Sequence, residues 1–221
     1  MDGLWVTLQI SIFGILLGIA LGAIISSMRM SKVNVFGKYL GLDFLDKIIN
    51  GFNRGVSYLY LDIVRGTPAV TQLFIWHFVI FNTPAVSRMT VVVIAIGVNS
   101  GAYVAEIIRA GLMSIDKGQA EAGRSLGLTS FRTMVFIVTP QAIKNILPTL
   151  VNEFIVLIKE TAIVSFAAVA DLNREAIRIR GVTFHPWMPI IAAAIIYYII
   201  IKILTIFLRR LEKKIRKSDA R

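Results

Sequence analysis

The stretch LWVTLQISIFGILLGIALGAIISSM, residues 4–28, holds 25 consecutive residues without a charged side chain. About 20 helical residues cross the hydrocarbon core of a bilayer, so this stretch alone is long enough to span a membrane. A cleaved secretory signal fits poorly, because its apolar core has about 7 to 15 residues and follows basic residues. Here Asp2 precedes the stretch, and no Lys or Arg does. We therefore expect an integral membrane protein.

The composition of the whole chain supports that expectation. Of its 221 residues, 56% are hydrophobic and 17% are charged, whereas soluble domains have about 25% charged residues. The net charge of +11 is by itself compatible with nucleic acid. However, the basic residues alternate with apolar runs, so we expect the lipid bilayer as a partner and no nucleic acid. The chain contains no cysteine, which excludes disulfides and thiol nucleophiles.

Four further apolar runs complete the predicted membrane domain. They cover residues 58–82, 89–108, 142–170 and 188–208. We expect one all-α integral membrane domain over residues 1–221, with five transmembrane helices. An odd number of spans places the two termini on opposite sides of the membrane.

The distribution of Lys and Arg predicts the orientation. Residues 29–54 carry five such residues (Arg29, Lys32, Lys38, Lys47 and Arg54), residues 109–133 carry four, and the tail from residue 202 carries eight. These segments share one side, whereas the other side has four, namely Arg88, Arg174, Arg178 and Arg180. By the positive-inside rule, the N-terminus lies outside, and the C-terminus and the loop 114–140 lie in the cytoplasm.

Three glycines, Gly14, Gly18 and Gly22, recur every four residues in the first apolar run. Such a stripe of small residues lets another helix approach closely in lipid. The neighbouring helix belongs either to the same subunit or to a second subunit.

The sequence lacks common signatures of enzymes. There is no G-x-x-x-x-G-K-[ST] loop, no H-E-x-x-H and no G-x-S-x-G. The two histidines, His77 and His185, stand alone and make a poor metal pair. We therefore expect no catalytic residue, no metal site and no cofactor in this chain, which leaves transport or membrane anchoring.

The loop 114–140, SIDKGQAEAGRSLGLTSFRTMVFIVTP, is polar and rich in small residues. It predicts two short helices, over 117–126 and 130–138, separated by Gly127 as a C-terminal cap, and Thr129-Ser130 offers N-terminal caps for the second. The first helix presents Ala120, Ala122, Gly123 and Leu126, a surface suited to a groove on another protein. A plain cytoplasmic connector is the alternative.

The residues Glu121-Ala122-Gly123, Gly127, Ile137 and Pro140 resemble the cytoplasmic EAA loop of ABC-importer permeases, E-A-A-x3-G-x9-I-x-L-P. Two positions depart from that pattern, since Gly123 replaces the second Ala and Thr139 replaces Leu. Further blocks are similar to the polar amino acid permease family in the same order: RGTPAVTQLF (65–74), NSGAYVAEIIRAGL (99–112), KGQAEAGRSLGL (117–128) and NEFIVLIKETAIVSFAAVADL (152–172).

This resemblance implies a fold like that of type I ABC importers and a place in the prokaryotic cytoplasmic (inner) membrane. It also implies three kinds of partner: a second permease subunit in a homo- or heterodimer, two cytoplasmic ABC ATPase subunits that bind ATP and Mg, and an extracytoplasmic amino-acid-binding protein. In the family, the EAA loop forms the coupling helix that enters a cleft on the ATPase. The implied coupling residues here are Lys117, Gly118, Glu121, Ala122, Gly123, Leu126 and Gly127.

Glu153 is the clearest candidate for contact with a substrate. If the fourth apolar run begins near Ala142, Glu153 lies about 16 Å further along a helix, near the middle of a hydrocarbon core about 30 Å thick. A carboxylate at this depth suits a cationic or amino-bearing ligand. Structural pairing with Lys144, Lys159 or an arginine of another span is the alternative.

Neighbouring polar residues are further candidates. Asn152 precedes Glu153, and Asn99 with Ser100 fall at mid-depth in the third run, where they either bind a ligand or join two helices. In the second run, Gly66 and Pro68 interrupt the helix. The freed backbone either lines a cavity, which makes Thr67 and Gln72 ligand candidates, or forms a simple kink. Glu106 and Arg109 fit a structural ion pair near the cytoplasmic end.

These observations predict a permease subunit of an ATP-driven importer for polar, in particular basic, amino acids. The permease itself performs no chemistry, because ATP hydrolysis belongs to separate ATPase subunits. The alternative is a secondary transporter or channel that works without ATP. Such proteins often contain internal repeats with paired broken helices, and no second copy of the RGTP or EAA block is found.

Overall fold

A computed structural model describes residues 2–30 and 43–219 of the chain, with side chains through residue 215. The regular secondary structure of these residues is all helical, and they contain no strand. Lys32 and Lys38, which entered the charge count for orientation, lie outside the described residues. Within the described residues, three helices are long and apolar enough to cross a membrane, or four if the bent pair described below counts as one span. The three are α1 (Asp2–Met30), α5 (Arg88–Met113) and α10 (Met188–Asp219, of which Met188–Ile215 is the apolar part). They contain the predicted spans 4–28, 89–108 and 188–208.

The second predicted span is not one straight helix. α3 begins at Asp43 and ends at Gly66, and the chain then bends by 106° into α4 (Ala69–Phe74) and the π-helical turns of η1 (Ile75–Ile80). Pro68 directly precedes α4 in extended conformation (φ −64°, ψ 137°), which stops the helix because proline restricts the residue before it. Residues 58–82 therefore do not form one continuous helix, and this part of the prediction is corrected.

The fourth predicted span is also shorter than its apolar run. α8 (Thr139–Glu160) is followed by the 3₁₀ turns of η3 (Thr161–Ala167), which end at Ala168 in left-handed conformation (φ 58°). α8 is less apolar than the three long spans and is not one of the candidate membrane helices in the described chain. The next helix, α9 (Leu172–Thr183), begins at a capping carboxylate, because Asp171 accepts a hydrogen bond of 2.9 Å from the Arg174 backbone nitrogen.

The core forms where α1 packs against α5. A Cβ atom at Gly18 would lie 3.0 Å from the Ser100 hydroxyl oxygen, and one at Gly22 would lie 2.6 Å from Val104. The glycine stripe therefore packs against a helix of the same subunit, which is the first of the two alternatives considered for it. Around this contact, α4, α8 and η3 contribute buried side chains, among them Leu73, Leu157 and Val164.

The loop 114–140 contains both expected helices. The first is α6 (Lys117–Ser125), and the second starts as α7 (Ser130–Thr133), continues through the π-helical turn η2 (Met134–Val138) and runs into α8. Thr129 caps the second helix by accepting a hydrogen bond from the Arg132 backbone nitrogen. The N-terminal cap at Thr129 is thus confirmed, while the second helix is longer than expected.

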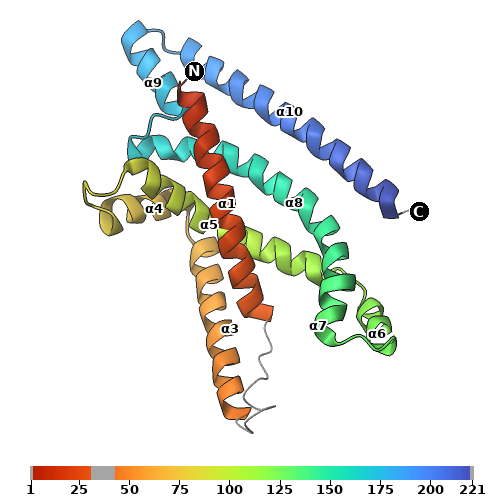
Figure 1. Ribbon diagram of the computed structural model, residues 1–221. Coiled ribbons are helices and arrows are strands. Elements are labelled where there is room, and N and C mark those ends of the chain that lie inside the picture. The colour runs from red at the N-terminus through yellow and green to blue at the C-terminus, as the bar shows by residue number, and fades with distance from the viewer. Residues whose placement is uncertain (1, 31–42, 220–221) are drawn as a thin grey trace.

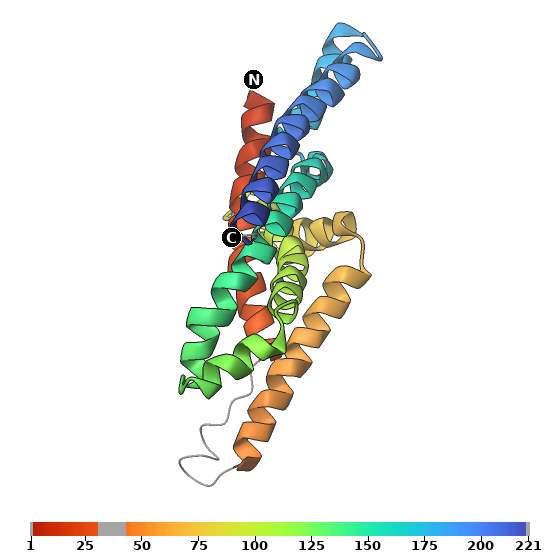
Figure 2. The ribbon, with the colours of Figure 1, turned by 90° about the vertical axis from the view of Figure 1, so that its right-hand side faces the viewer.

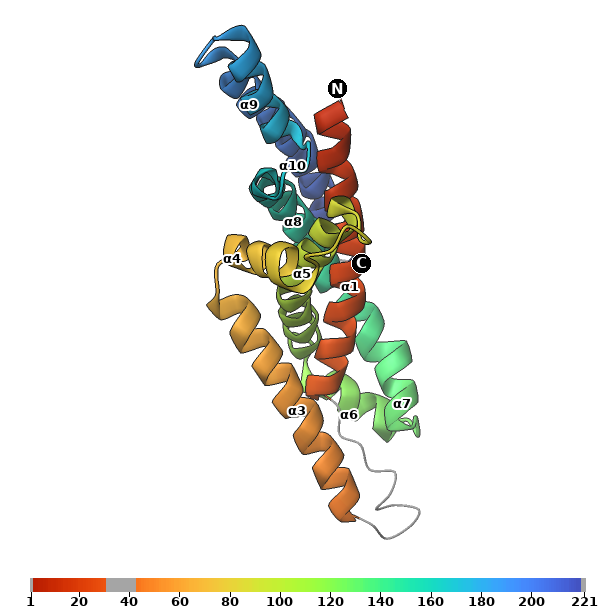
Figure 3. The same cartoon turned by 90° about the vertical axis from the view of Figure 1, so that its left-hand side faces the viewer.

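The elements are spread along an elongated molecule. The N-terminus of α1 and helix α9 lie at one end, and α6, α7 and the start of α3 lie at the opposite end (Figure 1). Side views show the same separation (Figures 2 and 3). The loop between α5 and α8 is therefore remote from the N-terminus.

Candidate functional site

Glu153 meets Ser100 at the contact between α8 and α5. The Ser100 hydroxyl donates a hydrogen bond of 3.1 Å to a carboxylate oxygen of Glu153. Ser100 is 2% exposed, and Glu153 is half-buried. The structure thus brings two of the predicted site residues together, and it leaves part of the Glu153 carboxylate accessible.

Gln72, Asn99 and Thr67 form a second group at the bend between α3 and α4. The Asn99 side-chain nitrogen donates to the Gln72 side-chain oxygen over 3.0 Å, and both residues are buried. The Gln72 side-chain nitrogen in turn lies 2.7 Å from the Val64 carbonyl oxygen and 2.8 Å from the Thr67 hydroxyl. Gln72 therefore supplies a donor to a carbonyl that the broken helix leaves without its usual partner.

Asn152 belongs to neither group. It is exposed on α8, beside Glu153 in the sequence but about a quarter turn away around the helix. The predicted site residues thus divide into the Ser100–Glu153 contact, the hydrogen-bonded group at the bend, and an exposed Asn152.

A cavity of about 440 Å³ lies beside Glu153, between α3, α5 and α8. Its lining includes Glu153, Thr149 and Asn145 from α8 and Arg65 from the end of α3. Arg65 and Tyr103 were not among the predicted site residues. The Arg65 guanidinium lies 5.9 Å from the centroid of the Tyr103 ring, within the range of a cation–π contact. Arg65 could have been identified from the sequence as a site residue, because it is a cation within an apolar run. No comparable feature of the sequence points to Tyr103.

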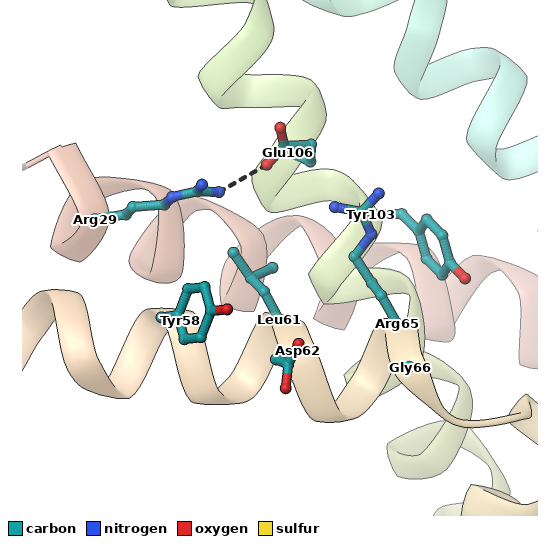
Figure 4. A pocket seen from close by; sticks show the side chains of 8 residues that line it. All are labelled: Arg29, Tyr58, Leu61, Asp62, Arg65, Gly66, Tyr103 and Glu106. Carbon is teal, nitrogen blue, oxygen red and sulfur yellow. Dashed lines mark hydrogen bonds and ion pairs between the residues drawn. The ribbon is translucent and has the colours of Figure 1, made fainter.

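An adjoining cavity of about 480 Å³ extends toward the end of α1 (Figure 4). The two cavities share Arg65, Tyr103 and Glu106, so they form one groove along α3 and α5. Arg29 of α1 points to Glu106 and forms an ion pair with it over 2.8 Å. Glu106 also pairs with Arg109, which confirms the ion pair predicted from their spacing. The groove thus contains cations and carboxylates, with Glu153 at one end and Arg29 at the other.

The predicted coupling residues lie mostly on the exposed surface of α6. Lys117, Gly118, Glu121, Ala122, Leu126 and Gly127 are exposed, and Leu126 is 82% exposed. The start of α6 is fixed by Asp116, whose carboxylate accepts a hydrogen bond of 2.6 Å from the Gly118 backbone nitrogen. The exposed apolar side chain of Leu126, directly after this short polar helix, is a surface on which another protein can pack.

Gly123 differs from the other six because it is buried against η2. A Cβ atom there would lie 2.8 Å from Ile137 and 2.9 Å from the Thr133 methyl carbon. The departure from the E-A-A pattern therefore has a packing reason, since an alanine would collide with the following helix. Gly127 has φ 83°, and hydrogen bonds from Gly127 to Arg124 and from Leu128 to Gly123 close the end of α6.

Comparisons with known proteins agree with this architecture. Residues 48–217 match the family model described as "Binding-protein-dependent transport system inner membrane component". The chain is 36% identical to the arginine transport system permease protein ArtQ of Bacillus subtilis (strain 168), over 99% of this chain and 93% of that protein. It is 33% identical to the glutamine transport system permease protein GlnP of Escherichia coli (strain K12), over 97% and 92% of the two chains.

Two solved structures are similar as well. A crystal structure of an amino acid ABC transporter with histidines has a TM-score of 0.83 and 39% identity, and the match covers 96% of this chain and 92% of that one. The methionine ABC transporter MetNI in an inward-facing conformation shares the fold, with a TM-score of 0.66 and 17% identity over 97% and 94% of the two chains. The chain therefore belongs to the family of binding-protein-dependent transport system inner membrane components, and it is a non-enzymatic, multi-pass permease subunit of an amino acid ABC transport system.

Proposed function

We propose that this permease imports basic amino acids and that the groove between Arg65 and Glu153 receives the substrate. The observation that carries the proposal is a cavity lined by a cation and a half-buried carboxylate within an apolar chain. An amino acid with a basic side chain carries one negative and two positive groups. Its carboxylate would pair with Arg65, and a cationic group would pair with Glu153. Arginine in the name of one relative and histidines in one structural title agree with this class, whereas glutamine in other names marks the main competing substrate.

The other polar residues that were predicted to contact the substrate have supporting roles in this proposal. Ser100 orients the Glu153 carboxylate, and Gln72 with Asn99 and Thr67 holds the bend that follows Arg65. Asn152 extends the polar surface of α8 next to Glu153. These assignments rest on the contacts around the groove and on the depth of Glu153 in the chain's apolar region.

We further propose that α6 couples the permease to its ATPase. Exposed Leu126, Glu121 and Ala122 support this role, together with the resemblance to the EAA loop. ATP and Mg would bind on two ATPase subunits, and their closure would move α6. A pair of permease subunits, identical or different, would then change the side to which its groove opens.

The proposed orientation places the N-terminus outside a prokaryotic inner membrane and α6 in the cytoplasm. It rests on the excess of Lys and Arg in the segments near α6 and in the C-terminal tail. A binding protein would deliver substrate at the opposite end, where α9 lies (Figure 1).

The decisive experiment is uptake and ATP hydrolysis by the reconstituted complex with a panel of amino acids. We expect arginine, lysine and histidine to stimulate ATP hydrolysis more strongly than glutamine. Glu153→Gln should weaken arginine transport about tenfold or more, because a hydrogen bond to a charged group contributes about 1.5–3 kcal/mol. Glu212→Gln on α10 is the control, since Glu212 is exposed and does not line the groove. Uptake of amino acids without ATP would contradict the proposal and favour a secondary transporter or channel.

A further inference from the structure

A row of residues spaced by four connects α6 to Glu153 along the continuous helical segment α7–η2–α8. Its members are Thr133, Ile137, Gln141, Asn145, Thr149 and Glu153. Side chains four apart form a ridge on a helix surface. We refer to these six residues as the α8 ridge, and its contacts extend from α6 to the groove.

The first part of the α8 ridge packs against α6. Ile137 and Thr133 enclose the position of Gly123, where no side chain larger than hydrogen fits without displacing them. One turn later, the side-chain amide of Gln141 donates a hydrogen bond of 3.2 Å to the Gln119 side chain. α6 is therefore held to this helix by an apolar contact and by an amide pair.

The middle of the α8 ridge is joined to the end of α5. The Asn145 side chain donates a hydrogen bond of 2.9 Å to the Ser114 hydroxyl, which itself donates to the Gly111 carbonyl oxygen over 2.8 Å. Ser114 is the residue that ends α5 and opens the connection to α6. Asn145 thus contacts the point where the groove helix α5 meets the loop that carries α6.

The last part of the α8 ridge enters the groove. Asn145, Thr149 and Glu153 line the cavity of about 440 Å³ together with Ser114. From Gln141 to Glu153 the helix rises about 18 Å. α8 is helical over this whole length and contains Pro148 between the two residues. Proline removes one backbone hydrogen bond and kinks a helix without ending it here, so a displacement applied at Gln141 reaches Glu153 by way of Pro148.

We propose that Gln141 and Asn145 are positioning residues that transmit the displacement of α6 to Glu153. The inference rests on the proposed function of α6 and of the groove. Both side chains make hydrogen bonds at exposed positions. Water can replace such bonds at little cost, because a hydrogen bond between protein groups has a small net free energy. The Gln119–Gln141 and Ser114–Asn145 pairs can therefore separate and re-form during a transport cycle, while Ile137 keeps α6 in register with α8.

The test uses the complete complex in vesicles, with permease, ATPase and binding protein, and with arginine as the probe. Two quantities are measured: ATP hydrolysed per arginine transported, and equilibrium binding of arginine to the permease without ATP. Asn145→Leu and Gln141→Met keep side-chain size and remove the hydrogen bonds. For both variants we expect ATP hydrolysed per arginine to rise about fivefold or more, the lower end of usual coupling between sites. Arginine binding is compared only for Gln141→Met, because Gln141 does not line the groove, and there it should change less than about twofold.

Ser114 provides the second half of the test. Ser114→Ala should give the same loss of coupling as Asn145→Leu, and the double variant should be no worse than either single variant, because each removes the same bond. Ser114→Thr retains the hydroxyl and should restore coupling. Thr205→Val on α10 is the control, since the Thr205 hydroxyl donates within its own helix, to the Ile201 carbonyl oxygen at 2.7 Å.

Three results would overturn the inference. The first is unchanged ATP use per arginine in both Asn145→Leu and Gln141→Met. The second is a parallel fall of arginine binding, hydrolysis and uptake in Gln141→Met, which indicates a purely structural role. The third is additive effects of Ser114→Ala and Asn145→Leu. Failure of the wild-type complex to couple ATP hydrolysis to uptake would instead contradict the proposed function, and with it the transmission that depends on it.

Discussion

Ser100 lies between Gly18 of α1 and Glu153 of α8. Its hydroxyl donates to Glu153, and the same oxygen atom would lie 3.0 Å from a Cβ atom at Gly18. A small residue in α1 therefore allows a side chain of α5 to reach the carboxylate that we assign to the substrate.

We expect Gly18→Ala to displace Ser100 and to impair the Glu153 site. Overpacking of a filled contact typically costs about 1–3 kcal/mol, so the melting temperature of the purified permease should fall. Arginine-stimulated ATP hydrolysis should fall as well. Gly51→Ala in α3 is the control, because a Cβ atom there meets nothing within 4 Å. That change should be neutral or stabilising, by up to about 1 kcal/mol.

Gly123→Ala restores the family pattern at the second Ala of the EAA loop, yet we expect it to reduce coupling. The new methyl group would meet Ile137 and Thr133 at less than 3 Å, which pushes α6 away from η2. The measurement is ATP hydrolysed per amino acid transported. Adding Thr133→Ser to the Gly123→Ala variant removes the methyl carbon that the new side chain at position 123 would meet. This double variant should recover part of the coupling. Full coupling in Gly123→Ala alone would show that the contact tolerates the extra atom.

Gly127→Ala should destabilise the end of α6. The backbone there has φ 83°, a conformation that costs a residue with a Cβ atom about 1–2 kcal/mol. We expect weaker binding of the ATPase subunits, measured by co-purification, with the amount of permease in the membrane unchanged. Gly127→Asn should bind more strongly than Gly127→Ala, because asparagine adopts this conformation more readily. Equal binding by both variants would contradict the explanation.

Gln72→Leu should destabilise the permease by about 1–3 kcal/mol. The substitution leaves the Val64 carbonyl oxygen and the Asn99 amide without their present partner in a buried region, and an unsatisfied buried polar group costs that much. Thermal unfolding in detergent measures the effect. Gln119→Leu is the comparison, since Gln119 is exposed, and its loss should leave the melting temperature within about 1 °C. A similar fall in both variants would argue against a special role of the bend.

The absence of cysteine allows a direct test of orientation. Single cysteines at Phe184, which is 88% exposed next to α9, and at Lys214 near the end of α10 would sit on opposite sides of the membrane. A membrane-impermeant maleimide added to intact cells should label Phe184→Cys, and it should label Lys214→Cys after the membrane is opened. The reverse result would invert the proposed topology.

The sequence predicted those features that depend on composition along the chain. α1, α5 and α10 follow from long apolar runs with few charges, and the end of α6 follows from Gly127. The Gly66–Pro68 interruption predicted a break in the second run, but not its angle of 106°. That angle depends on contacts such as Gln72–Asn99, which join residues 27 positions apart. A single sequence carries no signal for such pairs.

The candidate site, too, could be predicted only in part from the sequence. Depth in an apolar run identified Glu153, and the third run identified Ser100, yet their hydrogen bond depends on how α5 and α8 meet. Arg65 and Tyr103 come together only because the bend places the end of α3 beside α5. The burial of Gly123 likewise requires the position of η2, which local propensity does not contain.

The close packing of α1 on α5 has a mechanical consequence. At Gly18 and Gly22, side chains and backbone of α5 fill the space where a Cβ atom would lie, so these two helices resist sliding past each other and form one rigid body. Ser114, at the end of α5, accepts a hydrogen bond from Asn145 of α8 at an exposed position, and such a bond exchanges readily with water. Relative motion is therefore easiest along the boundary between α5 and α8, and the carboxylate assigned to the substrate lies on that boundary.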